Sequence, residues 1–174
     1  KHGSTRGDGF HGENVTPNLR TIRSIPLSIS DNTNGTLEVR GEVYFPISSF
    51  TAMNKKRVLE NLTPFSNPRN SASGSLRQLD SNITNERPLD IFIYGLGYSD
   101  GINTPNNHWD TMGFLQELGF KINPNNLYCT RLSEVKEYYD YWLAKRETLN
   151  YATDGIVVKV NRFEQQTQLG NVSR

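Results

Sequence analysis

The stretch DGIVVKV, residues 154–160, carries one lysine within an otherwise apolar run. This pattern predicts a tight turn at Asp154 and Gly155, followed by a strand in which Lys159 points away from its immediate neighbours. A lysine in that position either extends along the surface to reach water or directs its ammonium at an anion held above the sheet. One lysine by itself does not decide between these two interpretations.

A second group of charges lies in TLEVRGEVYF, residues 36–45, which is the clearest strand in the sequence. Glu38, Arg40 and Glu42 alternate with apolar residues, so all three share one face of the strand. Such a face is commonly a solvated sheet surface. Alternatively, it lines a cleft in which a carboxylate accepts hydrogen bonds from a ribose hydroxyl.

The glycine-rich stretch TRGDG, residues 5–9, indicates either a turn with solvated Arg6 and Asp8 or a contact for phosphate. It lacks the Gly-Lys-Ser/Thr of a P-loop and the strand-turn-helix setting of a dinucleotide fingerprint. Tyr94, in IFIYG, is either a core aromatic residue or a flat ring on which a base stacks. The three histidines have no partner at the spacing of a nucleophile or a metal site.

The stretch NPRNSASGSLRQLD, residues 67–80, combines two arginines with a run of small residues where bulk is usual. It is either a flexible linker or a docking surface. We interpret it as a docking surface, because the small residues 71–74 keep the surface low while Arg69 and Arg77 supply charge and forked donors for a phosphate backbone.

Composition restricts the classes of protein to which the chain can belong. It has 174 residues and a formal charge of +1, so any contact with nucleic acid must come from local patches. Cys129 is the single cysteine, which excludes a disulfide framework and makes a zinc site within this chain unexpected. Neither a membrane span nor a signal peptide is predicted, and we expect a cytoplasmic protein.

Strands and helices are predicted to alternate irregularly, with at least one antiparallel meander, which favours the α+β class. Beyond the two strands above, the expected extended and turn segments are Thr21–Ile29, a turn at Asn32–Gly35, a strand at Asp90–Gly97 and a mobile loop at Tyr98–Asn107. The expected helices are one capped by Ser48 or Ser49, one that ends at Gly119, and one capped by Ser133 whose aromatic stripe packs in the core.

The chain resembles the adenylation domain of bacterial NAD-dependent DNA ligases in several long blocks that occur in the same order. These blocks are TRGDG, ENVTPNLRTIRSIP, LEVRGEV, NPRNSASGSLRQLD, IFIYGLG and DGIVVKV, with LGNVSR also fitting. The match extends from near the first residue to the last and fades at Asp31–Gly35 and Tyr98–His108. The resemblance implies a nucleotidyltransferase fold of antiparallel sheets with flanking helices, with residues 1–174 forming part of an adenylation domain.

The same resemblance implies a role for individual residues around the nucleotide. Arg6 is similar to an arginine that contacts the nucleotide, Glu42 to the carboxylate on the ribose, and Tyr94 to the ring that stacks on adenine. Lys159 resembles the lysine that steadies the α-phosphate, and Asp154 resembles a supporting acidic residue that helps to organise metal. Lys159 and Asp154 are therefore the expected catalytic residues.

The resemblance also implies the partners and the reaction. Arg69, Arg77 and Arg146 resemble arginines that contact phosphate or DNA. The implied substrates are NAD and nicked duplex DNA, with Mg²⁺ or Mn²⁺ as the metal, and the implied protein is a monomer that seals nicks in replication and repair. The reaction proceeds through enzyme-AMP and DNA-AMP intermediates.

Two blocks of the family's site have no counterpart in this sequence. The nucleophilic lysine belongs to a Lys-x-Asp-Gly block, which KHGS at Lys1 does not match, and the family's final lysine block is also absent. The family's zinc is expected only in a downstream domain. A non-catalytic nucleotide- or DNA-binding fragment or degenerate homologue is the alternative, whereas the long block at residues 67–80 argues against an ATP-dependent ligase or capping-type relative.

We expect the isolated chain to form no covalent adenylate, because surrounding charges cannot replace a missing nucleophile. Intact-mass spectrometry after incubation with NAD and Mg²⁺ checks this expectation. A stable gain of one AMP would show that a residue within this chain acts as the nucleophile.

Overall fold

The computed structural model describes residues 1–29 and 35–170, so the turn predicted at Asn32–Gly35 lies outside the described residues except for Gly35. The chain divides into two compact units. Unit 1 consists of Lys1–Leu27, Val43–Ile91 and Asn150–Ala152, and unit 2 consists of Ser28–Glu42, Phe92–Leu149 and Thr153–Arg174.

Strands β1 (Thr36–Tyr44) and β2 (Asp90–Asp100) pair in a two-stranded sheet. They run antiparallel, because the Tyr44 hydroxyl at the end of β1 donates to the Asp90 carboxylate at the start of β2, at 2.9 Å. Burial alternates along β1 as predicted, with its three charged residues exposed. β2 continues to Asp100 rather than ending at Gly97, so the loop expected from Tyr98 is shorter than predicted.

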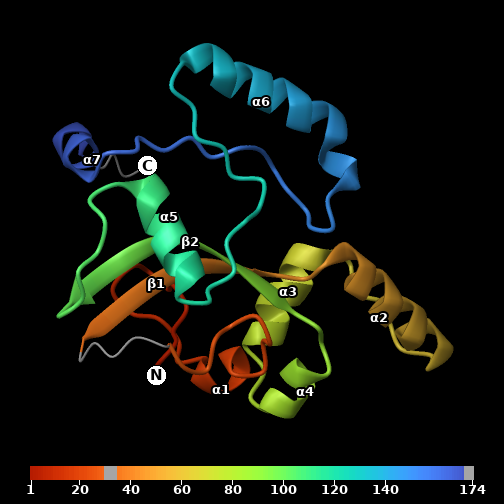
Figure 1. Ribbon diagram of the computed structural model, residues 1–174. Helices are drawn as coiled ribbons and strands as arrows, with labels where there is room; N and C mark the ends of the chain where they lie inside the picture. The colour runs from red at the N-terminus through yellow and green to blue at the C-terminus, as the bar shows by residue number, and fades with distance from the viewer. Residues whose placement is uncertain (30–34, 171–174) are drawn as a thin grey trace. The chain divides into compact units, whose positions relative to one another are not determined.

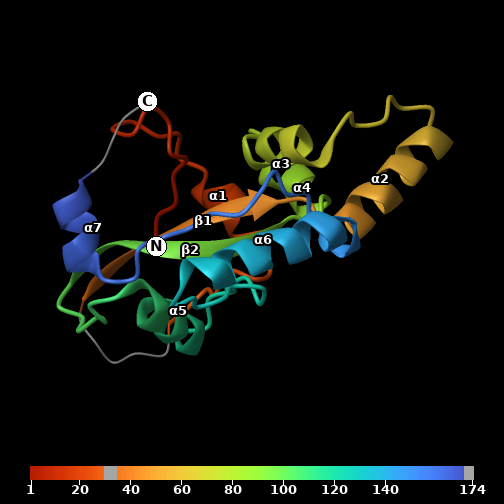
Figure 2. The same cartoon turned by 90° about the horizontal axis from the view of Figure 1, so that it is seen from above.

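In unit 1, helices α1 (Thr16–Leu19), α3 (Pro68–Leu76) and α4 (Ser81–Asn85) lie together, as Figures 1 and 2 show. The buried Asn18 amide joins them: it donates to the carbonyls of Leu76 and Gln78, both at 2.8 Å, and to the Thr84 hydroxyl at 3.1 Å. The two amide hydrogens are shared among these three acceptors, of which the Thr84 hydroxyl is fully buried. One asparagine of α1 therefore sets the ends of α3 and α4.

The helix α3 occupies most of the stretch that we interpreted as a low docking surface. Asn67 caps it by accepting from the Asn70 N–H at 2.8 Å, and Pro68 follows at the first helical position. Ser71 and Ala72 are buried, whereas Ser73 and Gly74 are exposed. The prediction is therefore wrong for Ser71 and Ala72, whose small side chains allow close packing within unit 1.

The helix α2 (Ile47–Leu59) starts without the cap predicted at Ser48 or Ser49. Pro46 occupies the N-cap position and has no side chain that could accept a hydrogen bond. Asn150 serves instead: its carbonyl accepts from the Ile47 N–H at 3.0 Å and its side-chain oxygen accepts from the Ser48 N–H at 2.8 Å. A residue about one hundred positions further along the chain thus caps α2.

The extended run predicted at Thr21–Ile29 is wrong. The N–H groups of Thr21, Ile22 and Ile25 each donate to a carbonyl three residues earlier, at 3.1 Å, which makes successive turns. These turns bury Ile22 in unit 1. Burial of this side chain, rather than strand pairing, decides the local conformation.

In unit 2, α5 (His108–Glu117) buries Thr111, Met112 and Leu115. Gly119 follows with φ of 91°, as expected for a glycine that ends a helix. The chain then returns to β2, where the Ile93 N–H donates to the Lys121 carbonyl at 2.8 Å.

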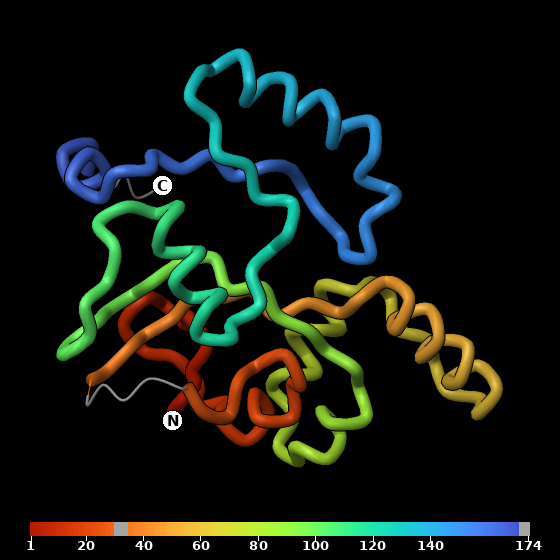
Figure 3. The backbone as a smooth tube through the Cα atoms, in the orientation of Figure 1, coloured from red at the N-terminus to blue at the C-terminus, as the bar shows by residue number. Residues whose placement is uncertain are grey.

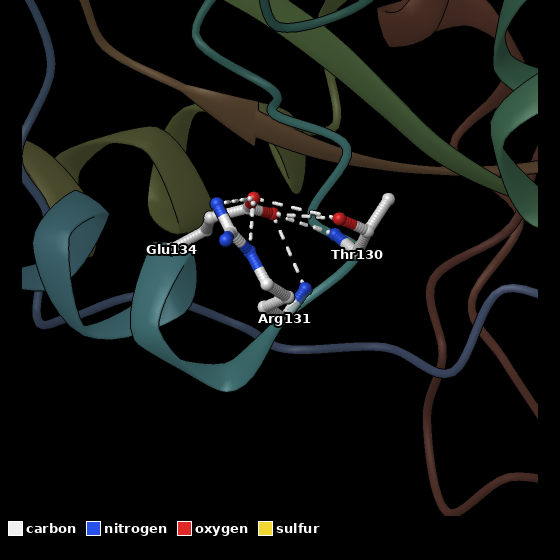
Figure 4. A network of polar contacts seen from close by, with 3 residues as sticks. All are labelled: Thr130, Arg131 and Glu134. Atoms are coloured by element: carbon white, nitrogen blue, oxygen red, sulfur yellow. Dashed lines mark hydrogen bonds and ion pairs between the residues drawn. The ribbon is translucent and has the colours of Figure 1, made fainter.

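Helix α6 (Leu132–Lys145) continues into a 3-10 turn, η1 (Arg146–Thr148). Ser133 does not cap it: the helix begins one residue earlier, and the Glu134 carboxylate accepts from the N–H groups of Thr130 and Arg131 and from the Arg131 side chain (Figure 4). The aromatic stripe is not in a core, because no residue of α6 is buried. That expectation is wrong for the described part of the chain.

The strand predicted after Asp154 is also wrong. Residues 155–160 form an extended segment without strand pairing to any described residue (Figure 3, the blue trace before α7). Val157 and Val158 are 81% and 65% exposed. A strand needs a neighbour for its N–H and C=O groups, and the described residues supply none here. The helix α7 (Phe163–Leu169), which we did not predict, follows.

The combination of one two-stranded sheet with helices confirms the α+β class. The nucleotidyltransferase fold remains a prediction. Among the described residues, no helix is both long enough and apolar enough to span a lipid bilayer.

The Glu134 cap generates a pH-dependent prediction. Hydrogen bonds from the Thr130 N–H, then from Arg131, lower the pKa of Glu134 below its ordinary value. Their contribution to stability is therefore present above the pKa of glutamate in the unfolded chain and is lost as the pH falls through the lowered pKa. We expect Glu134→Ala to accelerate hydrogen exchange at the Thr130 and Arg131 N–H groups just before α6, and less so at low pH.

Glu137→Ala is the matched control, because exposed Glu137 lies on the same helix and no hydrogen bond or ion pair to a described residue is found for it. Equal exchange in the two variants would contradict a capping role for Glu134.

Candidate functional site

The clearest contact between residues singled out in the sequence joins Lys159 to Tyr94 in unit 2. The Lys159 ammonium donates to the Tyr94 carbonyl at 2.8 Å and lies 5.0 Å from the centroid of the Tyr94 ring. Both Tyr94, which is 44% exposed, and Lys159 remain accessible to a ligand. The structure thus brings together the ring and the cation whose sequence patterns left two interpretations open.

The surroundings of Lys159 change its acidity and that of a neighbouring histidine. Partial burial of the ammonium lowers the pKa of Lys159. Burial, and then the charge of Lys159, lower the pKa of His108 at the start of α5, which favours the neutral imidazole. No function was predicted for His108, because no spacing in the sequence links it to a lysine fifty-one positions away.

Glu42 lies on the exposed face of β1 in the same unit. Its neighbours Glu38 and Arg40 form an ion pair at 3.1 Å, whereas Glu42 makes no hydrogen bond or ion pair with any described residue. Gly97 of β2 faces that pair: a Cβ at Gly97 would lie 2.0 Å from a Glu38 carboxylate oxygen. No contact among the described residues joins Glu42 to Tyr94 or Lys159.

Arg6 lies in unit 1, in a turn closed by the antiparallel bridge between Ser4 and Asn14. Asp8 holds this turn by accepting from the N–H groups of His11 and Phe10, which lowers the pKa of Asp8. Asp8 is therefore a structural residue and not merely solvated. The Arg6 side chain is exposed, and it belongs to a different unit from Tyr94 and Lys159.

The other predicted residues lie at exposed positions in both units. In unit 1, Arg69 is in the first turn of α3, and Arg77 ends this helix with an ion pair to Glu13 at 2.8 Å. In unit 2, Arg146 opens η1, 3.5 Å from the Glu147 carboxylate, and Asp154 precedes the extended segment. Within the described ranges, no cluster of three or more His, Cys, Asp or Glu side chains could hold a metal ion.

An exposed aromatic ring beside a lysine ammonium offers a stacking surface for a base and a cation for a phosphate, although Lys145 and Tyr141 form a similar pair elsewhere in unit 2. The comparisons with known proteins identify the class of protein. A family model described as the NAD-dependent DNA ligase adenylation domain matches residues 1–174, and the chain belongs to this family.

Individual relatives are DNA ligases. The chain is 50% identical over 172 residues to a DNA ligase of Dehalococcoides mccartyi, which covers 99% of the chain and 25% of the relative. It is 51% identical over 168 residues to one of Oceanobacillus iheyensis, covering 97% and 25%, and 45% identical over 174 residues to one of Thermotoga maritima, covering 99% and 25%. The chain thus spans about a quarter of the length of the curated relatives it matches.

The Lys159–Tyr94 contact predicts a measurable shift. We expect the pKa of Lys159 to lie below its ordinary value of 10.5 and to rise in Tyr94→Ala, because loss of the ring returns the ammonium to water. Since the unfolded chain binds this proton more tightly, the contribution of Lys159 to stability rises as the pH approaches 10.5.

Titration of the Lys159 side-chain carbon signals by NMR measures both values. Tyr98→Ala, which removes another exposed tyrosine of β2, is the control and should leave the titration unchanged. An identical Lys159 pKa with and without the Tyr94 ring would contradict the contact.

Proposed function

We propose that the chain forms the central part of the adenylation domain of an NAD-dependent DNA ligase, a monomer that seals nicks in duplex DNA during replication and repair in the bacterial cytoplasm. The contact between Lys159 and the exposed Tyr94 ring is the observation that carries this proposal. Membership of the adenylation domain family over residues 1–174 supports it.

The proposed reaction has three transfers at phosphorus. A lysine amine attacks the α-phosphorus of NAD and displaces nicotinamide mononucleotide; the AMP then passes to a DNA 5′-phosphate; and the adjacent 3′-hydroxyl displaces AMP. Negative charge accumulates on phosphate oxygens in each step, so positioned cations lower the barrier. No Lys-x-Asp-Gly block occurs in the printed sequence, and the proposal assigns the nucleophile to another part of the ligase.

In this proposal Tyr94 stacks on adenine and Lys159 binds the α-phosphate. The ammonium lies 5.0 Å from the ring centroid, and the ring is 44% exposed, so part of its surface can receive a base. A charged phosphate oxygen is a stronger acceptor than the neutral Tyr94 carbonyl, so substrate binding can draw the ammonium from one to the other. Because the ammonium is already partly desolvated, less water must be removed when it meets the phosphate.

Glu42 and Asp154, which also belong to unit 2, complete the proposed nucleotide site. Glu42 is exposed and free of partners among the described residues, so its oxygens are available to a ribose hydroxyl. For Arg6, which belongs to unit 1, contact with the nucleotide stays a prediction. Asp154 offers a carboxylate that suits Mg²⁺, which binds through one or two carboxylates and the substrate phosphates rather than through an all-protein cage.

Arg69, Arg77 and Arg146 are proposed to bind the phosphate backbone of nicked DNA. All three are exposed. On the surface of α3, Gly74 is open, since a Cβ there would meet nothing within 4 Å. The exposed Ser73 and Gly74 retain the role that we first assigned to the whole run of small residues. These local charges would explain how a chain of net charge +1 contacts DNA.

The full-length protein that contains this chain tests the proposal. We expect it to seal a nicked duplex with NAD and Mg²⁺ but not with ATP. Tyr94→Ala should lower kcat/KM for NAD by about 10- to 100-fold, the usual range for loss of one base–aromatic stack. Tyr98→Ala, on the same strand, is the matched control.

Sealing driven by ATP would instead support an ATP-dependent relative, and binding of nicked DNA without sealing would support a binding module. If Tyr94→Ala and Tyr98→Ala behave alike in an NAD-dependent ligase, the function stands but Tyr94 is not the stacking residue.

A further inference from the structure

We propose that Asn161 is a positioning residue that holds Lys159 in place by joining the end of its segment to the first turn of α5. The inference rests on the phosphate-binding role proposed for Lys159. It concerns a residue for which neither the sequence patterns nor the comparisons supplied a function.

Asn161 accepts hydrogen bonds from the first two backbone N–H groups of α5. Its carbonyl accepts from the His108 N–H at 2.8 Å, and its side-chain oxygen accepts from the Trp109 N–H, also at 2.8 Å. The third donor, the Asp110 N–H, goes to the side chain of Asn107 at 3.0 Å. N–H groups in the first turn of a helix have no partner within the helix, and its dipole favours acceptors there. Asn161 therefore supplies two acceptors to N–H groups that have no partner within α5.

The same region is joined by further backbone contacts. Asn107 and Arg162 form an antiparallel bridge, and the Phe163 N–H donates to the Asn106 carbonyl at 3.3 Å. From α7, the Gln166 amide donates to the Val160 carbonyl at 2.6 Å. The backbone that follows Lys159 is thus held at several consecutive residues.

The backbone that precedes Lys159 lacks comparable support. Residues 155–158 form no regular structure with other described residues, and Val157 and Val158 are highly exposed. The location of the Lys159 backbone is consequently determined mainly from its C-terminal side, where Asn161 is two residues away. A lysine side chain has four flexible bonds, so a fixed backbone is needed for its ammonium to reach the Tyr94 carbonyl reproducibly.

Unit 1 contains a matched example of the same pair of bonds. Asn150 accepts from the first two N–H groups of α2 through its carbonyl and its side-chain oxygen. Alanine at either asparagine removes one side-chain acceptor at a helix N-terminus and leaves the backbone bond. Of the two asparagines, only Asn161 lies next to the Lys159 segment. Comparing Asn161→Ala with Asn150→Ala therefore separates an effect on the position of Lys159 from the general loss of a helix cap.

The experiment measures single-turnover AMP transfer from NAD in the full-length ligase containing this chain, with thermal unfolding of each variant. We expect Asn161→Ala to slow AMP transfer about fivefold, the effect of one ordinary hydrogen bond, and Asn161→Asp to restore it because the carboxylate keeps an acceptor. Asn150→Ala should lower the Tm similarly but change transfer by less than about twofold. In a Lys159→Ala background, Asn161→Ala should have an effect of less than about twofold.

Each alternative outcome overturns the inference in a distinguishable way. If Lys159→Ala transfers AMP at the normal rate, both the proposed role of Lys159 and the inference fail. If Lys159→Ala is slow but the effects of Lys159→Ala and Asn161→Ala multiply independently, only the inference fails. If Asn161→Ala does not fold, Asn161→Gln replaces it in the experiment. This variant keeps the amide but displaces its oxygen by one methylene. Normal AMP transfer by Asn161→Gln would contradict the positioning role.

Discussion

Free N–H groups at helix N-termini are the constraint on which both units depend. Neither α2 nor α5 satisfies its first two donors from its own sequence, and in each case an asparagine far along the chain supplies a carbonyl and a side-chain oxygen. The Asn18 amide does the reverse in unit 1 by donating to carbonyls near the end of α3. Because backbone N–H groups at a helix N-terminus have no partner within the helix, these asparagines join segments that are far apart in the sequence.

The candidate site follows from this arrangement in unit 2. Asn161 bonds to the first turn of α5, two residues after Lys159. The Lys159 side chain reaches β2, where its ammonium contacts the Tyr94 ring and donates to the Tyr94 carbonyl. Neither contact neutralises the charge, so the ammonium remains available to an anion. Partial desolvation adds to this effect, because a cation that has lost part of its water binds a charged oxygen more strongly.

The small residues of α3 do not all form the docking surface that their sequence suggested. In α3, Ser71 and Ala72 allow the helix to pack closely in unit 1, and Ser73 and Gly74 lie on the outer side. One turn of helix therefore divides a uniform run into a packing face and an open face. The arginines at its two ends remain exposed, as a surface that binds phosphate requires.

The sequence by itself determined the features that depend on local periodicity and backbone chemistry. Alternation predicted β1 and its charged face, Gly119 marked the end of α5, and ordered blocks such as NPRNSASGSLRQLD identified the family. These signals are local because side-chain alternation and positive φ act within a few residues.

Only the tertiary structure decided where donors find acceptors and which predicted strands are paired. The first two N–H groups of α2 and of α5 bond to Asn150 and Asn161, which lie far along the chain, although the local Asn107 caps the third N–H group of α5. The segment 155–160 has the composition of a strand but no pairing partner among the described residues. The contact of Lys159 with Tyr94 likewise spans sixty-five positions. Pairing, capping and desolvation depend on distances in space, and local sequence patterns do not contain these distances.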